Sequence, residues 1–103
     1  MEDIKDIVVL EDAANDMVGG REFYESQAAG LGEYFWDSIL SDIESLILYA
    51  GVHQRFFGLL RLLSRRFPYA IYYEVSESVA YVIAILPVRN KPSGIKQKLE
   101  GRR

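Results

Sequence analysis

The sequence predicts an α+β domain in which a helical hairpin packs on one face of a mostly antiparallel sheet, in the order β-α-α-β-β-β. Three observations lead to this prediction. One short β-type run opens the chain, two stretches with helical spacing follow it, and three further β-type runs complete the pattern. Because 103 residues support only one core, we expect a single domain over residues 1–92 and a basic C-terminal tail over residues 93–103.

The first strand is predicted over residues 4–10, which read IKDIVVL. The spacing of apolar residues then changes to that of a helix, which we expect to continue to about Ala28. Asp12 or Asn15 is placed to cap the start of this helix, because short polar side chains accept hydrogen bonds from the first free N–H groups.

The second helix is predicted over residues 33–50 and is the clearest amphipathic element of the chain. Gly30 and Gly32 mark the short turn before it, so the two helices should form an antiparallel hairpin. Gly51 ends the helix. The apolar stripe consists of Phe35, Ile39, Ile43, Leu46, Ile47 and Ala50.

Three strands follow a loop at residues 52–57. They are predicted over residues 58–64, 68–75 and 79–86, and the short turn between the last two indicates an antiparallel hairpin. The helical hairpin covers one face of this sheet, and we expect the other face to stay open or to receive a partner. Residues 89–103 are basic and predict either a loose tail or a short terminal helix.

Composition excludes several kinds of site. The chain has no cysteine, so disulfides, thiolate metal sites and cysteine nucleophiles are absent. His53 is the only histidine, and we interpret it as a solvated loop residue. No acidic loop has the ligand spacing of a cation site, and no phosphate-binding glycine motif occurs, so we expect neither a metal nor another cofactor. The first residues lack the features of a signal peptide and the apolar runs are too short for a membrane span, which indicates a cytoplasmic protein.

Charge is distributed unevenly along the chain. Residues 1–50 contain two basic and twelve acidic side chains, a net charge of −10, whereas residues 51–103 contain ten basic and three acidic ones, a net charge of +7. A basic half of this kind often carries a surface that binds a partner. The alternative is a solvated surface whose two halves attract each other.

Arginines in the basic half are the candidate binding residues. Arg61 lies between leucines in the middle of a predicted strand, where a charge requires a carboxylate, a phosphate or water. If the strands pair as expected, Arg61, Arg65 and Arg89 converge on the open face of the sheet, where guanidinium groups bind phosphate or carboxylate. Alternatively, Arg61 pairs with an acid of its own chain. The predicted partner-binding residues are Arg61, Arg65, Arg66, Arg89 and Lys91.

Four segments resemble the RelE/ParE superfamily of type II toxin–antitoxin systems. They are Ala13 and Asp16 with the Phe23-Tyr24 pair, the turn and helix GLGEYFWDSILSDIESL, the strand and hairpin GLLRLLSRRFPYAIYYEV, and the closing strand IAILPVRNKP. The resemblance covers about residues 7–92. It is weaker in the last segment, because Pro87 and Asn90 stand where the family commonly has a histidine and a second arginine.

The resemblance implies a toxin neutralised by a cognate antitoxin, whose acidic, disordered segment folds on binding. The FPY hairpin, the few lysines and the negative net charge favour the ParE branch, whose members inhibit DNA gyrase. We then expect no direct contact with nucleic acid except through the antitoxin.

Two alternatives remain. One is a RelE-like, ribosome-dependent mRNA endoribonuclease, in which Arg61, Arg65 and Arg89 bind phosphate and Tyr69 or Tyr73 lies near the scissile group. The other is a non-toxic member that only binds its partner.

Overall fold

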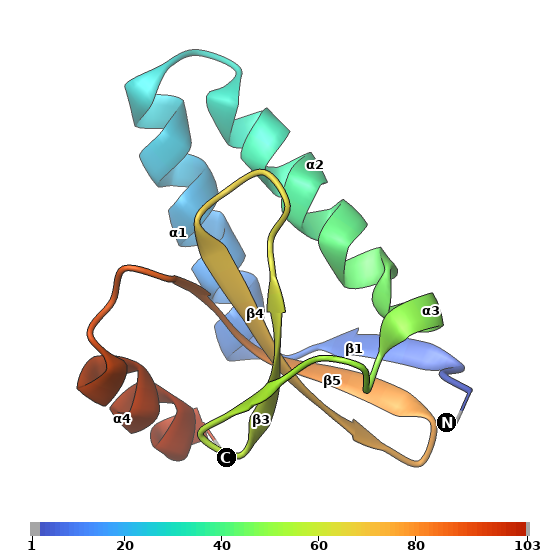
Figure 1. Cartoon of the computed structure of the whole chain (residues 1–103). Helices are drawn as coiled ribbons and strands as arrows, with labels where there is room; N and C mark the ends of the chain where they lie inside the picture. Colours follow the sequence, from blue (N-terminus) through green and yellow to red (C-terminus); the bar gives the residue numbers. More distant parts are fainter. Residues whose placement is uncertain (1–2, 103) are drawn as a thin grey trace.

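The computed structural model describes residues 3–102 and shows the predicted α+β arrangement of helices packed on a sheet (Figure 1). A short strand, a short helix and a C-terminal helix are added to the predicted order. None of the described helices is long and apolar enough to cross a membrane. In chain order the elements are β1 Asp6–Val9, α1 Glu11–Gln27, α2 Leu31–Glu44, α3 Leu46–Tyr49, β2 Arg55–Phe56, β3 Leu59–Leu63, β4 Tyr69–Ser76, β5 Val79–Pro87 and α4 Pro92–Arg102.

The strands form one sheet in the order β1-β5-β4-β3-β2. β1 runs parallel to β5, and all other neighbours are antiparallel. The β4–β5 hairpin is the longest ladder and places Ile71 opposite Ile85. Its turn has positive φ at Glu77 (49°) and Ser78 (67°), a backbone conformation that matches the twist of the two strands. β5 therefore has a hydrogen-bonded strand along both of its edges.

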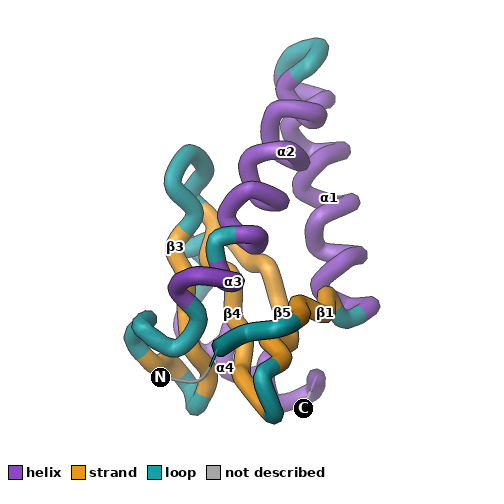
Figure 2. Tube along the Cα trace, turned by 90° about the vertical axis from the view of Figure 1, so that its right-hand side faces the viewer, coloured by secondary structure: helices purple, strands orange, loops and turns teal. Residues whose placement is uncertain are grey.

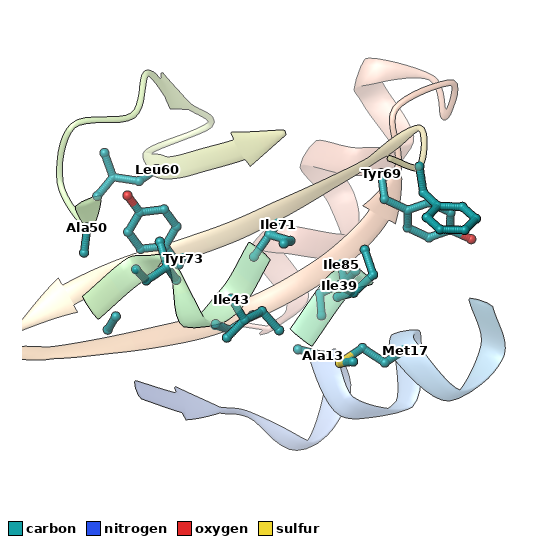
Figure 3. Packing of buried hydrophobic residues seen from close by; sticks show 14 of the residues in the cluster. Ala13, Met17, Ile39, Ile43, Ala50, Leu60, Tyr69, Ile71, Tyr73 and Ile85 are labelled. Atoms are coloured by element: carbon teal, nitrogen blue, oxygen red, sulfur yellow. The ribbon is translucent and has the colours of Figure 1, made fainter. Parts of the chain in front are cut away.

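The helices α1 and α2 form the predicted hairpin, which packs on one face of the sheet (Figure 2). They approach closely at Gly20, where an added Cβ would lie only 2.4 Å from Cζ of Phe35. The main apolar core fills the space between hairpin and sheet (Figure 3). Its buried members include Ala13, Met17, Phe35, Ile39, Ile43, Leu46, Ile71, Tyr73, Val82 and Ile85.

Two element boundaries differ from the prediction. Helix α1 begins at Glu11, so neither Asp12 nor Asn15 caps it; both lie inside the helix, and Leu10 occupies the cap position without a side-chain hydrogen bond. The loop predicted before the second strand contains the short strand Arg55–Phe56, which pairs with the start of β3.

The second helix is interrupted near its end, whereas the apolar stripe predicts a continuous helix to residue 50. α2 stops at Glu44, and the separate short helix α3 begins at Leu46. The hydroxyl of Ser45 donates to the carbonyl of Asp42 (2.6 Å). Such side-chain bonds to the preceding turn bend helices, which explains the interruption.

Helix α4 covers part of the second face of the sheet, so the expectation that this face stays open is wrong where α4 lies (Figure 1). Of the two forms that the sequence allows for the tail, residues 92–102 adopt the helix. Ile95 and Leu99 are buried in a second apolar cluster. Its members are Leu59, Ala70, Tyr72, Ile83, Ala84, Leu86, Ile95 and Leu99.

An ion pair joins the end of α4 to α1. The guanidinium group of Arg102 donates to both carboxylate oxygens of Asp16, at 2.6 and 3.0 Å, and to the carbonyl of Ile83 at 3.2 Å. The same carboxylate accepts the N–H of Ile85 at 2.9 Å. These hydrogen bonds to Asp16 raise the pKa of Arg102 above its usual value. Asp16 therefore connects α1, β5 and α4.

We predict that Asp16→Ala lowers the free energy of unfolding by about 3 kcal/mol, because removal of one partner leaves a poorly solvated charge on Arg102. Asp12→Ala is the matched control. Asp12 is exposed and lies 3.9 Å from Nε of Arg102, so its loss should cost less than about 0.5 kcal/mol. Urea unfolding curves measure both values, and equal losses would contradict a structural role for Asp16.

Candidate functional site

Four predicted binding residues gather at one end of the sheet. The residue pair Tyr69–Pro87 closes the β4–β5 ladder, and the N–H of Val88 donates to the carbonyl of Pro68 at 2.9 Å. These contacts bring the β3–β4 turn next to the segment that leaves β5. Each segment contributes two exposed cationic side chains, and we call this set the basic end. It consists of Arg65, Arg66, Arg89 and Lys91.

The buried carboxylate of Asp42 holds the β3–β4 turn against α2. Its Oδ2 accepts the hydroxyl of Ser64 at 2.7 Å and the N–H of Arg65 at 3.4 Å. Asp42 is 5% exposed, so these hydrogen bonds replace the water that the carboxylate has lost. The backbone of the turn is therefore fixed while the side chains of Arg65 and Arg66 remain in solvent.

Aromatic side chains lie beside the basic end. Phe67, within the β3–β4 turn, packs edge to face on Phe35, with ring centroids 5.1 Å apart, and lies 5.4 Å from Tyr34. The guanidinium carbon of Arg89 lies 5.9 Å from the ring centroid of Phe23. Phe23 and Tyr34 are 44% and 48% exposed. The surface thus offers guanidinium groups for anions next to aromatic rings for apolar side chains.

Arg61 does not belong to the basic end, so the predicted convergence of Arg61 with Arg65 and Arg89 is wrong. Arg61 pairs with Tyr72 in the middle of the β3–β4 ladder. Its guanidinium group lies over the ring of Phe56, 3.6 Å from the centroid. Alternation along β3 directs it to the face that α4 partly covers. Arg89, in contrast, contacts α1, which covers the other face.

Tyr69 and Tyr73 are core residues on the hairpin face of β4 (Figure 3). They are four positions apart on one strand, roughly 13 Å. Burial raises the pKa of both hydroxyl groups. The structure therefore does not bring these two phenols and the three arginines Arg61, Arg65 and Arg89 to one place.

His53 is a structural residue, contrary to the interpretation of a solvated loop side chain. It is half-buried, and its Nδ1 hydrogen-bonds to the hydroxyl of Tyr73. That hydroxyl also accepts the N–H of Gly51 at 2.9 Å. Burial lowers the pKa of His53. Within residues 3–102, no three His, Asp or Glu side chains are grouped so that they could hold a metal ion.

Sequence reasoning missed the roles of two acids, Asp42, which positions the site, and Asp16, which holds α4. Asp42 lies three positions after Ile39 and one before Ile43, on the apolar stripe of α2. A carboxylate at such a position is a signal for a buried hydrogen-bonded acid. The pairing of Asp16 with Arg102 had no comparable signal, because it joins positions 86 apart in the chain.

Comparison with known proteins gives a structural relative but no sequence relative. No protein-family model matches the chain, and no curated protein matches it. Among solved structures, a chain described as "Chromosomal ParDE TA system from P. aeruginosa" superimposes with a TM-score of 0.69 over 84% of this chain and 98% of its own length, at 15% sequence identity. The protein thus shares the fold of a chain from a ParDE toxin–antitoxin system.

Proposed function

We propose that the protein is the toxin of a type II toxin–antitoxin module, that it acts as a ParE-like inhibitor of DNA gyrase, and that a cognate antitoxin neutralises it in the cytoplasm. The observation that carries this proposal is the fold, which is shared with a ParDE chain across 84% of the sequence. The four sequence segments that resemble the superfamily provide separate support.

The positive charge of the basic end favours the binding of an acidic partner. Arg65, Arg66, Arg89 and Lys91 are all exposed, and within residues 3–102 none of them forms an ion pair; the ion pairs found there join Arg102 to Asp12 and Asp16. Unpaired guanidinium groups bind carboxylates through two parallel hydrogen bonds. An acidic antitoxin segment that folds on binding could place its apolar side chains on Phe23 and Tyr34.

The positions of the tyrosines favour binding over mRNA cleavage. Tyr73 is 0% exposed, and its hydroxyl is already hydrogen-bonded to Gly51 and His53. Arg61 lies on the other face of the sheet, over Phe56. A phosphodiester would need a proton-transfer group and cations within hydrogen-bond reach of the same phosphate. Tyr73 and Arg61 do not meet this requirement. Tyr69 lies nearer to Arg89, whose charge acts against the rise that burial causes in the pKa of the Tyr69 hydroxyl, but Tyr69 is only 8% exposed.

We expect the purified protein at micromolar concentration to inhibit supercoiling by DNA gyrase, and the protein encoded beside it to relieve the inhibition. Supercoiling of a relaxed plasmid, followed on agarose gels, measures both effects. If induction stops growth while gyrase stays active, and mapped mRNA ends show cuts at codon positions, the ribonuclease function replaces this proposal. If induction leaves growth unchanged, a non-toxic binding member replaces it.

We predict that the double variant Arg65→Ala/Arg66→Ala binds the antitoxin about 10–100-fold more weakly, because a total loss of about 1.5–3 kcal/mol, the worth of one charge-assisted hydrogen bond, corresponds to a factor of this size. Arg61→Ala is the control. It also removes an arginine, but Arg61 lies in the middle of β3 and outside the basic end. Isothermal titration calorimetry measures the affinities, and circular dichroism checks folding. A larger loss for Arg61→Ala would place the antitoxin on the α4 face instead.

A further inference from the structure

A second surface lies on the helical hairpin. A groove of about 460 Å³ runs between α1 and α2 and is lined by three residues of each helix. These residues are Arg21, Glu22, Glu25, Glu33, Trp36 and Asp37. Successive residues of a helix are about 100° apart around its axis. By this spacing the six lining side chains point away from the core, whereas Met17, Gly20, Phe35 and Ile39 face it. The groove therefore opens on the outside of the hairpin.

The groove suits a cationic side chain. Its lining holds four carboxylates and one guanidinium group, a net charge of −3. That guanidinium group, of Arg21, lies 4.6 Å from the ring centroid of Trp36. The carboxylate of Glu25 already accepts hydrogen bonds from the N–H groups of Gly30 and Gly32. Within the described chain, Glu22 and Glu33 remain exposed without an ion pair.

Arg65 and Arg66 of the same molecule cannot reach the groove, which Arg21 already lines. The β3–β4 turn packs on α2 through the contact between Phe67 and Tyr34. Tyr34 and Trp36 are two positions apart, about 200° around the helix, so they lie on opposite flanks of α2. Asp42, which holds the backbone of Arg65, likewise belongs to the buried side of α2. An Arg65–Arg66 turn that enters the groove must therefore belong to another molecule.

We propose that this groove binds the Arg65–Arg66 turn of a second copy of the protein. The turn stands out at the end of β3 and β4 beside α2 (Figure 1), and its two arginines are exposed and form no ion pair within residues 3–102. The carboxylates of Glu22, Glu33 and Asp37 complement them in charge. Groove and turn are different surfaces of one chain, so the contact is head-to-tail and can continue from copy to copy.

This self-association does not depend on the proposed function, because the protein alone forms it. It has a consequence for antitoxin binding, since both partners would use the same arginines. An antitoxin that covers the basic end would then separate the associated copies. Self-association and toxicity are measured separately, so either proposal can fail without the other.

Sedimentation velocity of the isolated protein tests the proposal. At about 0.01 M salt we expect a weight-average sedimentation coefficient that rises with protein concentration without a plateau. At about 1 M salt we expect a monomer, because the Debye length falls from about 30 Å to about 3 Å. A sedimentation coefficient that stays at the monomer value at low salt overturns the proposal.

Paired variants locate the contact. Association should be abolished by Glu22→Gln/Glu33→Gln in the groove and by Arg65→Gln/Arg66→Gln in the turn. The matched controls are Glu11→Gln/Glu44→Gln and Lys96→Gln/Lys98→Gln, which change the net charge equally at exposed positions elsewhere. The controls should retain association. Mixing Glu33→Arg with Arg66→Glu should restore association that neither shows alone. Equal effects of control and groove variants would mean that net charge alone governs association, and would overturn the proposed site.

Discussion

The antiparallel ladder between β4 and β5 is the interaction on which the other features depend. It extends from the turn at Ser76 and Val79 to the pair Tyr69–Pro87. Its far end brings two segments distant in sequence together and so creates the basic end. Its two faces receive the helical hairpin and α4, and its outer edge receives β1. A change that shifted this register by one residue would move the side chains of the shifted strand to the opposite face.

Charge separation gives the molecule two different surfaces on one small scaffold. The outside of the hairpin is acidic and includes an aromatic groove, and the end of the sheet is basic and lies beside exposed rings. The buried carboxylate of Asp42 holds the arginine turn in place, and the half-buried Asp16 holds α4. Such a molecule is suited to regulation through competition between partners for the same cations.

The sequence predicts those elements that depend on local pattern. The apolar stripe of α2, the aromatic strand β4 and the short turn after it are evident from spacing alone, and together they predict the α+β fold. The cover provided by α4 is less evident, because only Ile95 and Leu99 of that helix are buried. The hydrogen bonds of Tyr73 with Gly51 and His53 join positions more than a strand apart. Arg61 and Arg65 both follow the alternation of one predicted strand. Only the folded chain separates them, because Arg61 lies over Phe56 whereas Arg65 lies in the turn that Asp42 holds.

The parallel pairing of β1 with β5 has a consequence for how the chain folds. It joins residues at the start of the domain to residues near its end, with Asp6 beside Val79. During synthesis the first strand leaves the ribosome long before its partner exists, so the hairpin of helices can form early while the sheet cannot close. The entropy of this large loop must be overcome before the pairing gains any energy, which makes folding slow compared with that of a helical domain of the same length. Activity of the protein is therefore expected only after nearly the whole chain has been made.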